Sequence, residues 1–316
     1  MFRIPTIIKT SSGKLLAFCE GRKSLFDHGS IDLVMKTSAD NGSSWTPLKV
    51  VWTNRPNTCG NPSPVVDKLS GDVIIMATLT NDKVFVLRSK DEGATWEKPI
   101  DVTNSVKEPN WKWYATGPVH ALQLEQKDYK NRIVVPCNHT VMGINKHISH
   151  VIYSDDSGFT WRLGGSVSVE NTDECTVAEL SNSSLLLNMR NHDRTLPNRK
   201  ISVSNDGGQS WTSPEFDSTL IEPMCQGALL NYSYMPNTLL FSNPMHKKAR
   251  RNLTLSISYD QGKTWKKHIS LFDKKSAYSD IVVLGNGDVL CLFETGRILP
   301  YSGIKSIIIP QKMIVN

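Results

Sequence analysis

The chain has 316 residues, of which 39% are hydrophobic and 21% are charged, and it contains eight tryptophans. This is enough apolar material for a sizeable core, which excludes a mainly disordered protein. The net charge of +6 is mild, and the densest basic cluster, at 246–251, contains no aromatic side chain, so a nucleic-acid-binding surface is not indicated. No segment approaches the roughly 18 consecutive apolar residues of a transmembrane helix.

The N-terminus and the cysteines give only broad information. The opening MFRIPTIIKT lacks the pattern of a secretory signal peptide, so the protein is cytoplasmic or the N-terminus is incomplete, and the compartment stays unknown. The six cysteines are evenly spread without a CxxC pair, and the histidines are scattered. We expect buried, unpaired cysteines, and neither a metal nor an organic cofactor is implied.

An octapeptide with the pattern Ser-x-Asp-x-Gly-x-Ser/Thr-Trp occurs five times along the chain. The copies are SADNGSSW at 38–45, SKDEGATW at 89–96, SDDSGFTW at 154–161, SNDGGQSW at 204–211 and SYDQGKTW at 258–265. Asp, Asn and Gly favour turns, and an Asp side chain can accept hydrogen bonds from turn amides. We therefore interpret each copy, called an Asp box below, as a hairpin turn closed by a tryptophan anchor.

The segments around the boxes predict an all-β fold. IDLVMKTS, KVFVLRS, HVIYS and NLTLSIS are rich in β-branched or alternating residues, as strands are. Repeats of roughly 50 to 65 residues have room for four short strands, which is one propeller blade. The prediction is a single domain over 1–316, a six-bladed β-propeller with five Asp-box hairpins. The segment after 265, including DIVVLGNGDVLCLFE, supplies most of the last blade, and the N-terminal closing strand is expected to be short or missing.

Several segments between the boxes resemble the sialidase (neuraminidase) superfamily, in particular the non-viral exo-α-sialidases. They are FRIP at 2–5, LLAFCEGRKSLFDHGSIDLV at 15–34, NPSPVVD at 61–67, WYATGP at 113–118, DECTVAEL at 173–180, LLLNMRNH at 185–192, FSNPMHKKARRNLTLS at 241–256 and SAYSDIVVL at 276–284. Their order and spacing make the resemblance specific, and it runs nearly end to end. It implies hydrolysis of terminal α-linked sialic acids on glycoproteins, gangliosides or oligosaccharides.

The resemblance implies an arginine cluster for the substrate carboxylate. Its members are Arg3 in FRIP, Arg190 in LLLNMR and Arg250, for which Arg251 is the competitor. Planar guanidinium groups suit a carboxylate because they can bind both oxygens. A fourth arginine, Arg22, matches the family position at the rim of the sugar pocket.

The resemblance also implies the catalytic groups. Asp27, five residues after Arg22, matches the general acid/base, with Asp32 as the alternative. Tyr278 in SAYSD matches the nucleophile, and Glu174 in DECTVAEL matches its base. Sialidases are the exception among glycosidases in using a tyrosine nucleophile. The nearby arginines are expected to give the phenol partial phenolate character.

Further residues are candidates for supporting roles. Glu294 matches a glutamate that orients Arg3, and Tyr114 and Gln226 fall in segments that line the family pocket. The segment GPVHA at 117–121 carries Val and Ala where the family more often has glycine, which predicts an altered pocket floor. Two alternative functions remain: a catalytically inactive sialoglycan-binding propeller, and a trans-sialidase.

Overall fold

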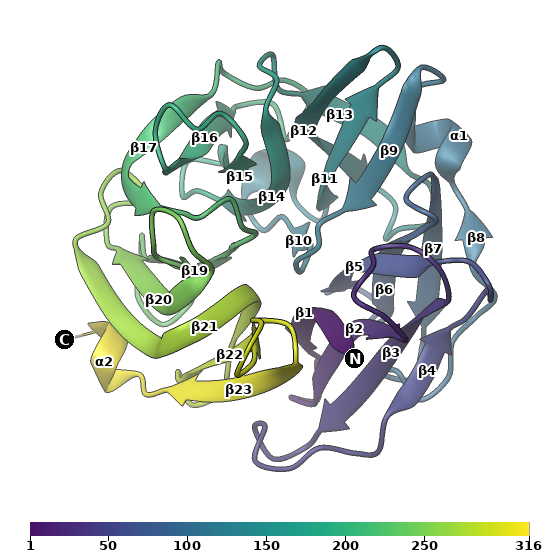
Figure 1. The fold of residues 1–316 in the computed structure, drawn as a ribbon, viewed down its shortest axis with the longest axis horizontal. Helices are drawn as coiled ribbons and strands as arrows, with labels where there is room; N and C mark the ends of the chain where they lie inside the picture. The colour runs from purple at the N-terminus through teal and green to yellow at the C-terminus, as the bar shows by residue number, and fades with distance from the viewer. Residues whose placement is uncertain (316) are drawn as a thin grey trace.

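The computed structural model describes residues 1–315 as a ring of antiparallel sheets around a central axis (Figure 1). Four of the sheets are one blade each and the fifth sheet contains two blades, and successive blades follow the chain around the ring. Blade one contains β1 (Phe2–Lys9), β2 (Leu15–Arg22), β3 (Ile31–Ser38) and β4 (Lys49–Trp52). Blade two contains β5 (Cys59–Val66), β6 (Val73–Leu79), β7 (Lys83–Ser89) and β8 (Ile100–Asp101).

Blades three and four follow the same pattern. Blade three has an additional strand, because β9 and β10 both pair with β11. Its strands are β9 (Trp111–Thr116), β10 (Leu122–Gln123), β11 (Ile133–Val141), β12 (Ile144–Ser154) and β13 (Arg162–Ser166). Blade four contains β14 (Thr172–Glu179), β15 (Leu185–Asn191), β16 (Asn198–Ser204) and β17 (Glu215–Ile221).

Blades five and six share one long strand, β21 (Lys267–Val283). Its first part pairs with β20 and its second part with β22, so the two blades form one continuous sheet. Blade five also contains β18 (Ala228–Asn231), β19 (Leu239–Pro244) and β20 (Arg251–Ser258), and blade six contains β22 (Val289–Thr295) and β23 (Gly303–Ile309). The predicted six-bladed all-β propeller is confirmed, including the source of its last blade.

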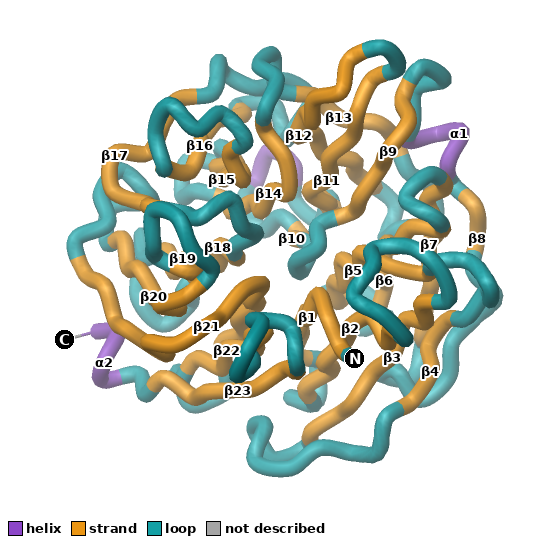
Figure 2. Tube along the Cα trace, viewed as in Figure 1, coloured by secondary structure: helices purple, strands orange, loops and turns teal. Residues whose placement is uncertain are grey.

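Within residues 1–315, helical structure is limited to three short elements. They are α1 (Thr103–Val106), the 3-10 helix η1 (Lys127–Tyr129) and α2 (Lys312–Val315). α1 and α2 lie at the outside of the ring (Figure 2). No helix in the described part of the chain has the length and apolar character needed to cross a membrane.

The Asp boxes form the hairpins between the last two strands of blades one to five. In the first box, Asp40 accepts hydrogen bonds from the amide and hydroxyl of Ser44, at 2.9 and 2.6 Å. The same pair of bonds recurs in the other four boxes. The fifth box position has φ between +77° and +91°, a backbone conformation that favours glycine. The boxes are therefore structural hairpins, as predicted.

The apolar core lies between neighbouring blades. One cluster joins Leu16 and Phe18 of blade one to Ile75 and Leu87 of blade two. Another joins Ile7 of blade one to residues of β21 and β22 and so closes the ring. All six cysteines are buried and unpaired, as expected.

Candidate active site

A cavity of about 600 Å³ is lined by residues from all six blades, which places it at the axis of the ring. This volume is within the usual range for a small-molecule site. Seven of the ten residues expected from the sequence line it: Arg3, Arg22, Asp27, Glu174, Arg190, Arg250 and Tyr278. The Asp-box residues do not line it. The repeated motif builds the ring, and residues from separate strands build the cavity.

Three guanidinium groups surround the ring of Tyr278. Arg3 comes from blade one, Arg190 from blade four and Arg250 from the loop just before β20 in blade five. The Cζ atoms of Arg3 and Arg250 each lie 5.4 Å from the centroid of the Tyr278 ring. Nη1 of Arg190 donates to the Tyr278 hydroxyl at 3.1 Å. Arg251, the alternative to Arg250, is exposed and does not line the cavity.

Each of the three arginines is held by protein acceptors. Arg3 donates to Glu294 at 3.0 and 3.3 Å, and Glu294 is fully buried. Arg190 donates to Glu174 at 2.7 Å. Arg250 donates to the carbonyl of Met224 at 3.0 Å. These bonds fix the directions of the guanidinium groups before any ligand arrives.

Neighbouring residues keep the guanidinium group of Arg190 protonated. Burial by itself would lower the pKa of Arg190, but the charges of Glu174, Tyr278 and Asp173 outweigh burial and raise the pKa well above its ordinary value. The guanidinium therefore stays positively charged. A small anionic group fits this part of the cavity.

Tyr278 and Glu174 form a direct pair at the base of the cavity. The Tyr278 hydroxyl donates to Oε1 of Glu174, although the two residues are 104 positions apart in the chain. Glu174 lies on β14 and Tyr278 on β21. Glu179, at the other end of β14, faces away and accepts the amides of Glu125 and Gln126. The phenol thus has one carboxylate placed to receive its proton.

The prediction that Tyr278 has partial phenolate character is wrong. Burial of the phenol raises the pKa of Tyr278 well above its ordinary value, and the negative charge of Glu174 adds to this increase. Arg190 and Arg250 act in the opposite direction with smaller effect. The phenol is therefore neutral, and its proton is directed at Glu174.

Asp27 lies on the loop between β2 and β3, at the open side of the cavity. Its side chain is 65% exposed and its Oδ1 contacts Arg22 at 2.5 Å and Arg3 at 3.5 Å. Arg22 itself is buried and is also held by Glu20, two residues earlier on the same face of β2. Asp32, the alternative acid, pairs with Arg55 and does not line the cavity. Of the two carboxyl groups, Asp27 is therefore the one that lines the cavity and is exposed.

Three expected residues lie outside the cavity wall. Tyr114 is fully buried in the core of blade three, where its hydroxyl bonds His150 Nε2 at 3.0 Å. Because side chains alternate along β9, its neighbours Trp113 and Ala115 face the cavity instead. Gln226 is also buried.

The other two residues, Gln226 and Glu294, form hydrogen bonds with the backbone of β21. The side chain of Gln226 donates to the Ser279 carbonyl and accepts the Ser279 amide, both at 3.0 Å. Glu294 accepts the Tyr278 amide at 3.3 Å while it holds Arg3, as the resemblance implies. The segment at 117–121, predicted to form an altered pocket floor, also lies outside the cavity wall. Val119 lies in the apolar core, and Ala121 lines a different pocket.

The cavity contains further residues that the sequence did not indicate. Tyr301 accepts from Arg250 at 3.1 Å, and its ring lies 4.2 Å from the Cζ atom of Arg3. Asp173, next to Glu174, bonds His192 at 2.6 Å and lies 3.4 Å from His147. Asp173 could have been predicted as a cavity residue from the sequence, because it is adjacent to Glu174. Tyr301 lies on the loop between β22 and β23, where no pattern marked it.

Metal binding is not indicated by the side-chain geometry. Within residues 1–315, no group of three or more His, Cys, Asp or Glu side chains is arranged to hold a metal ion.

Comparison with known proteins agrees with this architecture. The family profile of the BNR repeat-like domain matches residues 13–291. A sialidase of Bacteroides fragilis is 28% identical over 93% of this chain and 60% of its own length. An exo-alpha-sialidase of Aspergillus fumigatus is 31% identical over 82% of this chain and 68% of its own length.

The fold agrees with a solved structure as well. The structure of a Hadza microbial sialidase superposes with a TM-score of 0.89 at 27% identity, and the match covers 99% of this chain and 66% of that one. The chain spans about half to two thirds of the length of several relatives that it matches. Profile, sequence identity and fold lead to one conclusion: this chain belongs to the sialidase family.

Proposed function

We propose that the protein is an exo-α-sialidase that hydrolyses terminal α-linked sialic acids of glycoproteins, glycolipids or oligosaccharides with retention at the anomeric carbon. The observation that carries the proposal is the hydrogen bond from Tyr278 to Glu174 inside a ring of three arginines. Sialic acid carries a carboxylate on its anomeric carbon. Guanidinium groups that bind this carboxylate bring the anomeric carbon close to the phenol.

In the first step, the oxygen of Tyr278 attacks the anomeric carbon and the phenolic proton passes to Glu174. The glycosidic bond breaks, and the leaving oxygen takes a proton from Asp27. A neutral phenol is a suitable nucleophile because a carboxylate would be repelled by the substrate carboxylate. The product of this step is an aryl glycoside, in which the anomeric carbon is bonded to the tyrosine oxygen.

In the second step, Asp27 accepts a proton from a water molecule, and the water oxygen attacks the anomeric carbon. The bond to the tyrosine oxygen breaks, and the phenol regains its proton from Glu174. Two displacements at the same carbon retain its configuration. The exposure of Asp27 suits this double role, since both the leaving group and the water must reach it.

The test is release of the fluorophore from a fluorogenic sialic acid glycoside by the purified full chain. Turnover above buffer between acidic and neutral pH, with the α-anomer as first product by NMR, is expected. Binding of sialylated glycans without turnover would instead indicate a binding propeller. Transfer of the sugar to another glycan in preference to water would indicate a trans-sialidase.

A further inference from the structure

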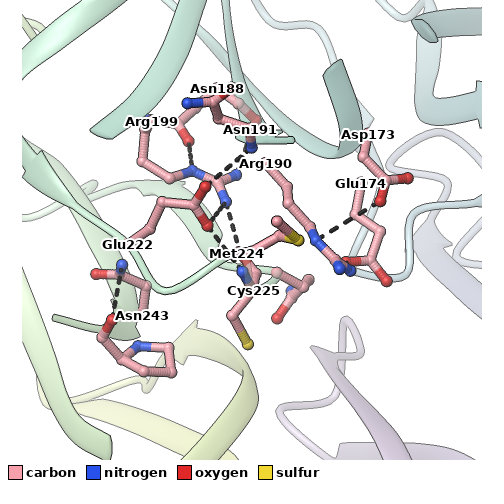
Figure 3. Close-up of polar contacts among 12 residues, drawn as sticks. Asp173, Glu174, Asn188, Arg190, Asn191, Arg199, Glu222, Met224, Cys225 and Asn243 are labelled. Carbon is pink, nitrogen blue, oxygen red and sulfur yellow. Dashed lines mark hydrogen bonds and ion pairs between the residues drawn. The ribbon is translucent and has the colours of Figure 1, made fainter. Parts of the chain in front are cut away.

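A buried ion pair lies near Arg190 and near Met224, the residue whose carbonyl holds Arg250 (Figure 3). Arg199 on β16 and Glu222, just after β17, are both fully buried, and Nη1 of Arg199 lies 3.5 Å from Oε2 of Glu222. Neither residue lines the cavity. Arg199 also donates to Asn188 Oδ1 at 2.6 Å and to the carbonyl of Cys225 at 2.7 Å. The pair therefore contacts the backbone that supports the cavity and does not contact a ligand there.

The carboxylate of Glu222 accepts hydrogen bonds from the backbone next to Arg190 and from the backbone next to Met224, which holds Arg250. Its Oε1 accepts the amide of Asn191, the residue after Arg190, at 2.9 Å. Its Oε2 accepts the amide of Cys225 at 2.7 Å. The carbonyl of the preceding residue, Met224, is the acceptor that holds Arg250.

The backbone at Met224 needs such support. Met224 has φ of +57°, in the left-handed region, where a residue with a side chain is strained by about 1–3 kcal/mol. Glu222 binds the amide of Cys225 and Arg199 binds its carbonyl, so the residue after Met224 is held on both sides. This keeps the Met224 carbonyl directed at Arg250.

We propose that Glu222 is a positioning residue that sets the spacing between Arg190 and Arg250, and thereby the affinity of the cavity for a carboxylate. The inference rests on the proposed function, because it names the substrate carboxylate as the ligand of these arginines. It predicts that loss of Glu222 weakens recognition of the carboxylate and leaves the rest of sugar recognition nearly intact.

The experiment measures calorimetric affinities of the full chain for an unsaturated sialic acid inhibitor and for its methyl ester, which lacks the negative charge. In Glu222→Gln, one oxygen becomes an NH₂ group facing a backbone N–H, and Arg199 loses its counter-charge. We expect affinity for the acid to fall at least about 10-fold and affinity for the ester to fall less than about 3-fold.

Glu179→Gln is the matched control. Glu179 is also a buried glutamate that accepts two backbone amides, at 2.7 and 3.0 Å, but these belong to residues 125 and 126. This variant should keep both affinities within about 2-fold. Unchanged acid affinity in Glu222→Gln, or equal losses for acid and ester, would overturn the inference. If the wild-type chain fails to prefer the acid over the ester, the proposed function itself is contradicted.

A double-mutant cycle with Arg250→Ala tests the route of the effect. If Glu222 acts through Arg250, the combined loss is smaller than the product of the two single losses. Independent losses would contradict the inference. Should Glu222→Gln not be recovered folded, Arg199→Met/Glu222→Gln removes both buried charges together and retains similar volume, and the same loss of acid-over-ester preference is expected.

Discussion

Buried glutamates recur at the strained positions of the cavity wall. Glu20 accepts the amide of Asn61 at 2.9 Å, and Glu294 accepts the amide of Ile4 at 2.8 Å. Asn61 and Ile4 both have positive φ, at 53° and 60°, and Ile4 is β-branched, for which this conformation is unusual. Glu222 accepts the amide of Cys225, the residue after Met224, which also has positive φ. The strained backbone conformation directs polar groups into the cavity. Hydrogen bonds to the carboxylates offset the free-energy cost of that strain.

The first prediction concerns the nucleophile. Tyr278→Phe should lower kcat for the fluorogenic sialoside by at least about 10³-fold, because the phenol oxygen that forms the covalent bond is removed. The thermal transition should change little, since the hydroxyl contacts only cavity residues, Glu174 and Arg190. A fluorinated sialic acid that traps the intermediate should label the wild-type peptide containing Tyr278 in mass spectrometry. Label on Glu174 or Asp27, or full activity of the variant, would contradict the assignment.

The second prediction separates two adjacent arginines. Arg250→Ala should weaken binding of a sialic-acid-like carboxylate inhibitor by at least about 10-fold, because a bidentate, partly desolvated charge pair is lost. Arg251→Ala should bind it as the wild type does, since Arg251 is exposed outside the cavity. Calorimetric titration checks both. Equal affinities of the two variants would show that Arg250 does not take part.

Cavity residues that lie in specific motifs could be predicted from the sequence. Which side chains of a strand point into the cavity could not be predicted. FRIP and SAYSD locate Arg3 and Tyr278 because their neighbours are distinctive. The position of Tyr114 was wrong by one residue, since alternation fixes only which residues share a face of β9. The neighbouring blade decides which face meets the cavity. The pKa of Tyr278 depends on burial, which no motif reports.

At the scale of elements, the Asp box is the best-defined unit. Its turn chemistry is local, so five hairpins and their strands could be predicted from short stretches of sequence. The double role of β21 could not be predicted in this way. Its middle, at 273–275, is exposed and charged and has the composition of a connecting loop. Pairing with β20 on one side and β22 on the other keeps it extended.

The third prediction is a loss of stability at acid pH that arises in the boxes. Hydrogen bonds from the hydroxyl and amide of residue 44 lower the pKa of Asp40 to about 2, and those of residue 95 do the same for Asp91. The unfolded value is about 3.9, so these bonds stabilise the fold above pH ~4 and are lost as pH falls toward 2. The urea midpoint should therefore decrease over this interval.

Asp91→Asn is the variant that checks the source of the effect. It should be less stable than wild type at neutral pH and should show a smaller decrease between pH 4 and 2, because its side chain does not titrate. An identical pH dependence of the two proteins would show that this box does not contribute.

At the scale of the whole molecule, the ring is closed at its axis by Asp280. This buried residue of blade six accepts the amide of Ile7 in blade one at 2.9 Å. It also accepts the amide of His120, at 3.2 Å, and lies 2.6 Å from Nδ1 of its ring. Three parts of the ring thus meet at one carboxylate. The core clusters between blades provide the apolar part of the same closure.

The fourth prediction concerns this closure. Asp280→Asn should lower the free energy of unfolding by about 3 kcal/mol, because a buried charged pair loses one partner. Burial by itself would lower the pKa of His120, but the charge of Asp280 outweighs it and raises the pKa above its ordinary value. This contribution is complete below pH ~6.5 and disappears as pH rises through the folded pKa.

Denaturant unfolding at several pH values measures the effect. The wild type should lose stability as pH rises from ~6.5 through the folded pKa of His120, and His120→Gln should lack most of that dependence. A flat wild-type profile, or an unchanged slope in His120→Gln, would show that this pair does not stabilise the ring.

The strand shared by blades five and six restricts how this region of the chain can vary in length. Between other blades, a connecting segment can absorb an inserted or deleted residue without moving the strands on either side. In β21 there is no such segment between the pairing with β20 and the pairing with β22. One residue gained or lost near 273–275 would shift the register of one of these two pairings. A shift of the second pairing would separate the amides of Tyr278 and Ser279 from Glu294 and Gln226, which bind them. This stretch of sequence must therefore keep a fixed length for as long as the cavity keeps its phenol.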